Sequence, residues 1–255
     1  IGLTICEDIW DANGPGKQVC GKGQADVLLN ISSSPYFKGR GKAREDMIQQ
    51  RARQYKAHIV YANLIGGQDE LVFDGHSLVV APDGTFITKG NSFEEEMIYA
   101  DLEIHPKSIK QNSKKVAGSS IKTYYVPTTL NGTDKPTIPI RKIRKLGATE
   151  EVFKALVIGT RDYMRKNGFG KAVIGLSGGI DSALTAVIAV NAIGPENVVG
   201  VTMPSTYSSQ GSIDDSKTLA KNLGIRILSL PIKDAMHAYD QILSKIFKGL
   251  PSDST

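Results

Sequence analysis

The chain has 255 residues, of which 40% are apolar and 22% are charged, and its net charge at neutral pH is +5. This length suffices for one large hydrophobic core or for parts of two. No apolar run reaches the length of a membrane span, and the first residues lack the basic region and cleavage site of a secretory signal. The two cysteines, Cys6 and Cys20, do not make a disulfide framework, so we expect a cytoplasmic location.

Both ends of the chain suggest an internal piece of a longer polypeptide. The sequence begins with Ile1 inside an apolar run, and it stops at PSDST directly after a helical pattern. We therefore expect any site built from this chain to lack some of its parts.

Short β-rich runs dominate the chain up to about His105. They are IGLTI, ADVLLNIS, HIVYANLIG, HSLVVAP, TFITKG and MIYADLEIH. The PDG at 82–84 predicts a hairpin turn between two of these runs, and a helical pattern covers 41–56. Residues 106–147 are polar, contain three prolines from Pro127 onward and lack a clear period, which indicates a linker.

From Ala148 onward, helical and strand patterns alternate. A helix is predicted over 148–168, with Thr149 as its cap and Gly168 as its stop. Strands KAVIGL, NVVGVTMP and IRILSLPI then alternate with helices ALTAVIAVNAI and DDSKTLAKNLG. This order predicts βαβ units and a doubly wound parallel α/β sheet.

A basic run falls at the end of the linker, at Arg141, Lys142, Arg144 and Lys145. Two interpretations of this run stay open: it forms a solvated face, or it contacts nucleic acid or phosphate.

The stretch GLSGGIDSAL, at 175–184, lies between an apolar strand and a helix. A helix amino terminus offers free N–H groups and a partial positive charge to an anion. Gly178 and Gly179 let backbone amides approach phosphate oxygens, and the hydroxyls of Ser177 and Ser182 can add donors. Asp181 would repel a phosphate, but it suits Mg²⁺ carried by a nucleotide.

Two common phosphate loops do not fit this stretch. A Walker A loop needs a lysine after its last glycine, and the dinucleotide fingerprint needs a different glycine spacing. The pattern S-G-G-x-D-S resembles the pyrophosphate loop of the ATP pyrophosphatase superfamily, whose members cleave ATP between its α- and β-phosphates. That resemblance implies ATP contacts at Gly175, Leu176, Ser177, Gly178, Gly179, Ile180, Asp181, Ser182 and Met203, with Asp181 as the metal ligand.

The segment TICEDIW places Cys6 at the end of a predicted strand, directly before Glu7 and Asp8. A lone cysteine is usually a buried small apolar residue, and two neighbouring acids oppose thiolate formation. A reactive thiol would therefore need a basic partner from elsewhere in the protein. Nevertheless, CEDIW resembles the nucleophile motif of the nitrilase superfamily, in which a cysteine works with a glutamate and a lysine.

ADVLLNISSSPYFKG and YANLIGGQDELVFDGHSLVVAPDG extend this resemblance to the glutaminase domain of the glutamine-dependent NAD⁺ synthetases. That family joins a nitrilase-like glutaminase to an ATP pyrophosphatase domain in this order. The resemblance implies an αββα sandwich over 1–105, a linker over 106–147 and the doubly wound domain over 148–255, both domains being incomplete. It also implies ATP, Mg²⁺, glutamine and deamido-NAD⁺ as ligands, a homo-oligomer, and neither nucleic acid nor membrane as a partner.

The resemblance assigns site residues in the glutaminase part as well. Cys6 is the implied nucleophile, and Ser34 and Arg40 match the segment that grips glutamine, with Ser33 as a rival for Ser34. Glu7 is a further candidate for that pocket. The resemblance implies that the family's catalytic glutamate and lysine lie before the first residue of this chain.

Three functions stay open on the sequence. The first is glutamine-dependent amidation of deamido-NAD⁺. The second is another amidotransferase or an ATP pyrophosphatase with a different substrate, such as tRNA, which the basic run favours. The third is a fragment that binds ligands without turnover.

Overall fold

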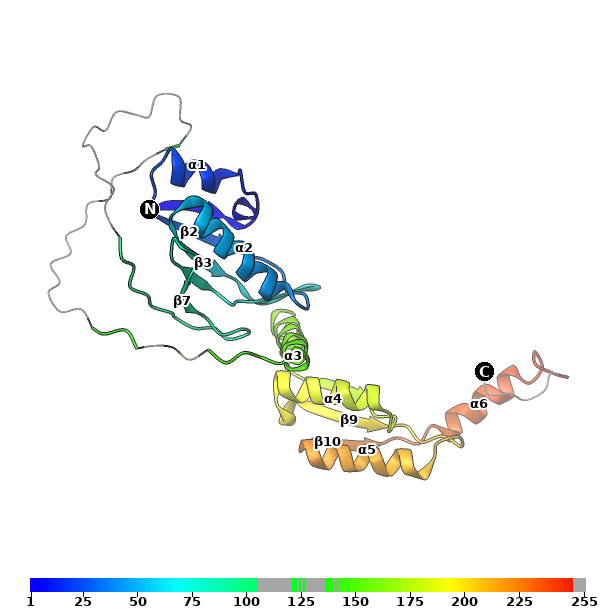
Figure 1. The fold of residues 1–255 in the computed structure, drawn as a ribbon. Helices are drawn as coiled ribbons and strands as arrows, with labels where there is room; N and C mark the ends of the chain where they lie inside the picture. The colour runs from blue at the N-terminus through cyan, green and yellow to red at the C-terminus, as the bar shows by residue number, and fades with distance from the viewer. Residues whose placement is uncertain are drawn as a thin grey trace. The chain divides into compact units, whose positions relative to one another are not determined.

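The computed structural model describes residues 1–104, 121–122, 124, 126, 136–139, 141 and 143–249, and Figure 1 shows its ribbon. By its internal contacts the chain forms two compact units, Ile1–Gly159 and Thr160–Thr255. None of the helices in these described ranges combines the length and the apolarity that a bilayer crossing requires.

The first unit is built on a five-stranded sheet with the order β1-β2-β3-β6-β7. Its strands are β1 (Gly2–Ile5), β2 (Val27–Ser32), β3 (His58–Asn63), β6 (Leu78–Val80) and β7 (Phe86–Lys89). The first three strands are parallel, and β6 and β7 continue the sheet in antiparallel pairing. Because the register pairs Ile5 with Ile31 and Ser32 with Asn63, all three parallel strands end at one edge of the sheet.

Two helices and a small hairpin complete this unit. Helix α1 (Pro15–Gly21) packs near β1 and β2, and helix α2 (Arg40–Tyr55) packs on β3 and β6. The hairpin consists of β4 (Ile65–Gln68) and β5 (Leu71–Asp74). A short 3₁₀ turn, η1 (Cys6–Ile9), follows β1 directly.

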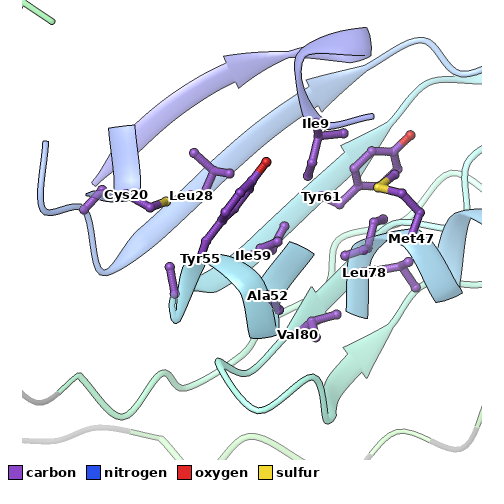
Figure 2. Close-up of a cluster of buried hydrophobic side chains, with 13 residues drawn as sticks. Ile9, Cys20, Leu28, Met47, Ala52, Tyr55, Ile59, Tyr61, Leu78 and Val80 are labelled. Atoms are coloured by element: carbon purple, nitrogen blue, oxygen red, sulfur yellow. The ribbon is translucent and has the colours of Figure 1, made fainter. Parts of the chain in front are cut away.

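The main core of the unit lies between the sheet and these helices. Figure 2 shows its side chains, which come from η1, α1, β2, α2, β3 and β6: Ile9, Cys20, Leu28, Met47, Ala52, Tyr55, Ile59, Tyr61, Leu78 and Val80. Alternation along the strands points these side chains to one face. The opposite face presents Leu3, Ile5 and Ile31, each more than 60% exposed. Such an apolar face agrees with the sandwich architecture expected from the resemblance, in which two sheets pack face to face.

The second unit holds a three-stranded parallel sheet with the order β10-β9-β8. Its strands are β8 (Ala172–Gly175), β9 (Val198–Thr202) and β10 (Arg226–Ser229), and helices α4 (Ile180–Ile193) and α5 (Gln210–Leu223) connect them. Both helices contribute to one core with the sheet, through Ala186, Ala189, Val198 and Ala220. A short 3₁₀ turn, η2 (Pro195–Asn197), precedes β9, and helix α6 (Lys233–Leu243) follows β10.

Helix α3 (Ala148–Lys166) runs from the first unit into the second. Within the first unit, its Ala155 and Ile158 pack with Phe93 in a separate small core, next to Tyr36 and Val72.

Most of the predicted elements are confirmed. The hairpin at 82–84 joins β6 to β7, and Gly84 takes a positive φ of 87° in its turn. Helix α3 stops where Gly168 takes a φ of 74°, and Gly194 and Pro195 end α4. The alternating helices and parallel strands of the second unit confirm the α/β fold class.

Four details differ from the sequence-based expectations. Residues 97–104 form no strand, since no described strand pairs with them and a strand needs a hydrogen-bonded neighbour. The run at 58–66 is divided, because β3 ends at Asn63 and β4 begins at Ile65. Thr149 lies inside the first turn of α3, not at its cap, and α5 begins before the predicted 214. Most of the predicted linker at 106–147 falls outside the described residues.

The start of α2 is tied to the sheet by a charged cluster. The Glu45 carboxylate accepts hydrogen bonds from His76 Nε2 at 2.8 Å and Lys89 Nζ at 2.7 Å. His76 Nδ1 lies 3.1 Å from Ser92 Oγ on its other side. Hydrogen bonding to His76, together with Lys89, lowers the pKa of Glu45 from 4.5 to about 2, although partial burial opposes this shift.

This pKa predicts an acid-sensitive contribution to stability. A lowered pKa in the folded state stabilises the protein above pH 4.5, and that stabilisation is lost as the pH falls toward 2. We expect Glu45→Gln to remove about 2–3 kcal/mol of this pH-dependent stability, measured by urea denaturation between pH 7 and pH 2. Glu70→Gln, at an exposed position beside β5, is the control and should follow the wild-type profile. An unchanged acid limb in Glu45→Gln would contradict the role of this cluster.

Candidate active sites

Cys6 lies at the point where β1 ends and the 3₁₀ turn begins. Its φ is 45°, a left-handed conformation that non-glycine residues seldom adopt and that is often found at functional sites. The turn is closed by Asp8, whose Oδ2 accepts a hydrogen bond from Ile5 N at 2.9 Å. The thiol is half-buried, whereas the Glu7 side chain next to it is exposed. The strained turn therefore presents a single thiol at the sheet edge.

The buried Arg51 of α2 fixes the far end of this turn. Its Nε donates to the Ile9 carbonyl at 3.0 Å, and its Nη2 donates to the Trp10 carbonyl at 2.7 Å. Two charge-assisted bonds from one planar group hold the backbone more firmly than a single neutral bond does. The segment that carries Cys6 is thus anchored to the core of the unit.

The predicted glutamine-binding serine lies in the loop after β2, and Asn63 holds it in place. Ser34 is buried, whereas its rival Ser33 is exposed. Asn63 Oδ1 accepts a hydrogen bond from Ser34 N at 2.9 Å, and Asn63 Nδ2 donates to Ser34 O at 3.4 Å. Both bonds involve the backbone of Ser34, so the Asn63 amide fixes the orientation of this residue.

A buried ion pair supports the same loop. Arg44 of α2 binds Asp74 through two hydrogen bonds of 2.9 and 3.1 Å, and both side chains are almost fully buried. Asn63 Nδ2 also approaches Asp74 Oδ1, at 3.5 Å. A two-pronged arrangement of this kind offsets the cost of burying both charges.

Tyr61 brings a neutral hydroxyl to the same edge. Its hydroxyl donates to Ser32 Oγ at 2.9 Å. Burial raises the pKa of Tyr61, although the hydrogen bond with Ser32 and the charge of Arg44 oppose this shift, so the hydroxyl stays protonated at neutral pH.

Arg40, at the first position of α2, stacks on the residue that ends the Cys6 turn. Its Cζ lies 3.8 Å from the centroid of the Trp10 ring and 5.2 Å from that of Phe37. Helix α2 thus carries Arg40 and also contacts both the turn of Cys6 and the ion pair next to the loop of Ser34. Glu7, by contrast, is exposed on the surface.

The second site is the loop between β8 and α4, which is held by its own hydroxyls. Ser182 Oγ accepts from Ser177 N at 3.2 Å and donates to Gly179 O at 3.0 Å, and Ser177 Oγ accepts from Gly179 N at 3.2 Å. The cap residue Gly179 offers no side-chain acceptor to α4, and the first N–H groups of a helix have no partner within it. The loop is thus shaped before any ligand arrives, with helix N–H groups available to an anion.

Gly178 is required by two independent constraints. Its φ is 82°, and a Cβ at this position would stand 2.5 Å from the carbonyl oxygen of Ser212 in α5. Ser209 caps α5 by accepting a hydrogen bond from Ser212 N at 3.1 Å, so this helix also begins next to the loop. Two helix starts therefore meet beside Gly178.

A cavity of about 250 Å³ lies beside this loop, at the carboxyl ends of β8 and β9. Its lining includes both residues that the resemblance assigned to ATP and residues that it did not: Gly175, Leu176, Ser177, Thr202, Met203, Pro204, Ser208, Ser212, Ile213 and Ser216. Ligands of open parallel α/β sheets bind at this edge. Met203 is 51% exposed and can cover an apolar ring system there.

Asp181 lies in the first turn of α4, and its side chain contacts no hydrogen-bond or ion-pair partner among the described residues. Within those residues, no three His, Cys, Asp or Glu side chains gather to hold a metal ion alone. This arrangement fits Mg²⁺ better than a structural metal, since Mg²⁺ takes one or two carboxylates and keeps water and phosphate ligands.

Two family models match different parts of the chain. The carbon-nitrogen hydrolase model matches residues 1–106, and the NAD synthase model matches residues 152–251. Residues 1–106 are thus similar to carbon-nitrogen hydrolases and residues 152–251 to NAD synthases, and these ranges are called the carbon-nitrogen hydrolase segment and the NAD synthase segment. The thiol lies in the first segment, and the serine-rich loop lies in the second.

Relatives match across both segments. The glutamine-dependent NAD⁺ synthetase of Thermotoga maritima is 43% identical over 100% of this chain and 45% of its own length, and that of Aquifex aeolicus is 40% identical over 94% and 42%. Among solved structures, the glutamine-dependent NAD⁺ synthetase of Acinetobacter baumannii in complex with ADP aligns with a TM-score of 0.77 at 33% identity, over 99% of this chain and 42% of that one. The chain thus spans less than half the length of the relatives that it matches.

The structure adds residues that sequence reasoning missed. In the carbon-nitrogen hydrolase segment they are Trp10, Arg44, Arg51, Tyr61, Asn63 and Asp74, and in the NAD synthase segment they are Thr202, Ser212 and Ser216. Several of them, such as Trp10, Tyr61, Asn63 and Asp74, stand within quoted motifs, but no motif assigned them a role. Their contacts join distant parts of the chain, which no local pattern marks.

Gly178→Ala tests the tight contact between the loop and α5. We expect a loss of about 2 kcal/mol or more in the free energy of unfolding, because the new Cβ meets backbone and requires a strained φ. Gly211→Ala, at the start of α5, is the matched control, since its Cβ would meet only Ser209 Oγ at 3.8 Å. That change should be neutral or mildly stabilising in a helix. Equal stabilities of the two variants in urea denaturation would show that the contact at Gly178 is not tight.

Proposed function

We propose that this chain carries parts of both active sites of a glutamine-dependent NAD⁺ synthetase. The observation that carries the proposal is the pairing of a strained strand-end cysteine with a preshaped anion loop on one chain. Relatives of this name match it across both segments. The reaction would convert deamido-NAD⁺, ATP and glutamine to NAD⁺, AMP, pyrophosphate and glutamate.

In the first site, the Cys6 thiol would attack the side-chain amide of glutamine. A thioester to Cys6 would form and ammonia would leave, and water would later release glutamate. Ser34, fixed by Asn63, and Arg40, stacked on Trp10, would hold the amino-acid end of glutamine. The chain's own residues supply the nucleophile and the orientation of the substrate.

In the second site, the loop from Ser177 to Ser182 would bind the phosphates of ATP through helix N–H groups. Mg²⁺, held in part by Asp181, would neutralise phosphate charge. Met203 and the cavity beside it would take the adenosine. We further propose a cytoplasmic homo-oligomer with the domain division at 1–105, 106–147 and 148–255.

Two arginines of the basic run, which favoured a substrate such as tRNA, are paired with acidic side chains of this chain. Arg141 forms an ion pair with Glu96, and Arg144 Nη2 lies 2.9 Å from Glu150 Oε1. Lys142 lies outside the described residues, and the pairing of Arg141 and Arg144 favours the interpretation of these two side chains as part of a solvated face.

Cys6→Ala in the full-length protein should separate the two reactions. Synthesis driven by glutamine should vanish, because no thiol opens the amide, while synthesis from a high concentration of ammonium should keep a substantial fraction of the wild-type rate. Cys20→Ala, at a buried thiol in α1, is the control and should retain both activities. Efficient use of glutamine by Cys6→Ala would make Cys6 an ordinary packing residue and overturn the glutaminase assignment.

Asp181→Asn in the full-length protein should abolish NAD⁺ formation with either nitrogen source. Both sources need the same adenylated intermediate, and that step needs the metal on the ATP phosphates. Asp215→Asn, at an exposed acid in α5, serves as the control and should behave like the wild type. Near-normal synthesis from ammonium by Asp181→Asn would refute the metal assignment.

A further inference from the structure

The guanidinium of Arg40 is stacked but otherwise unpaired. It lies on the face of Trp10, 3.8 Å from the ring centroid, with Phe37 at 5.2 Å. It makes no hydrogen bond or ion pair with any residue that the structure describes, and its Nε is buried without a partner. Other arginines of the same helix are paired, since Arg44 binds Asp74 and Arg51 binds two carbonyls. Arg40 therefore keeps its donors for a group that is not part of this chain's described residues.

Stacking leaves the hydrogen-bonding edge of a guanidinium free while it fixes its plane. A planar fork of N–H donors fits a carboxylate through two parallel bonds. An aromatic face attracts the cation without occupying any of these donors. The arrangement suits recognition of a small carboxylate ligand.

The aromatic partner is rigidly connected to the nucleophile. Trp10 follows Cys6 by four residues, packs against the main core and has its carbonyl bound by Arg51 at 2.7 Å. Phe37 is 56% exposed and lies farther from Arg40. Trp10 thus links the position of the Arg40 cation to that of the Cys6 thiol through one short, anchored turn.

We infer that Trp10 is a positioning residue that makes the Cys6 site selective for amides bearing an α-carboxylate. It does so by fixing the plane of the Arg40 guanidinium against the same anchored turn that carries Cys6. This inference rests on the proposed glutaminase function, in which Arg40 contacts the substrate. Trp10 itself acts through Arg40 and not on the substrate.

The test compares Trp10→Leu, Trp10→Phe and Phe37→Leu in the full-length protein, with release of ammonia as the readout. Trp10→Leu should raise the KM for L-glutamine about 10-fold, while kcat stays within about 3-fold of the wild type. Trp10→Phe restores an aromatic face and should recover most of the affinity, and Phe37→Leu should change KM less than about 2-fold. L-glutamine α-amide, which lacks the carboxylate, should be used equally by the wild type and Trp10→Leu, so that the preference for glutamine falls.

A second variant separates positioning from a general packing defect. In an Arg40→Ala background, Trp10→Leu should raise KM less than about 2-fold further, because its partner is already gone. An equal further rise in that background, or an unchanged KM in Trp10→Leu alone, would overturn the inference. Failure of the wild-type protein to release ammonia from glutamine would instead refute the proposed glutaminase function, so the two failures are distinct.

Discussion

Parallel strand pairing is the constraint on which both candidate sites depend. In the first unit it aligns the carboxyl ends of β1, β2 and β3, so that Cys6, the loop holding Ser34, and Asn63 at the end of β3 meet at one edge. In the second unit the same pairing brings the loop after β8 next to the end of β9. Both sites thus arise where a strand turns at once into a helix or a helical turn, and where side chains distant in sequence converge.

Helix α2 converts that edge into a defined site by means of three arginines with different partners. Arg44 forms the buried pair with Asp74, Arg51 binds the backbone of the Cys6 turn, and Arg40 stacks on Trp10. Two of these charges are satisfied within the protein, which makes the helix a rigid support. The third has its plane fixed and its donors free, which is the condition for binding an anion. The structural roles of Arg44 and Arg51 and the proposed binding role of Arg40 therefore lie on one helix.

The sequence was informative where a local pattern decides the structure. Strand and helix periodicities predicted most elements, and the CEDIW and SGGIDS motifs identified the two site loops. It misled where strand formation depends on a neighbouring strand. The apolar run at 97–104 has the composition of a strand, but no described strand pairs with it. It also could not predict the contacts of Asn63 with Ser34, of Arg44 with Asp74, or of Gly178 with Ser212, because these depend on tertiary approach between distant segments.

The central claim is that the two sites act in one reaction, in which nitrogen freed at Cys6 is used at the SGGIDS loop. The direct measurement gives the full-length protein ATP, deamido-NAD⁺ and glutamine labelled with ¹⁵N in its side-chain amide, in the presence of unlabelled ammonium at a low concentration. Mass spectrometry of the product should show one ¹⁵N in each NAD⁺ carboxamide, with one AMP formed per molecule. Release of labelled ammonia without labelled NAD⁺, or NAD⁺ that carries only unlabelled nitrogen, would contradict the account.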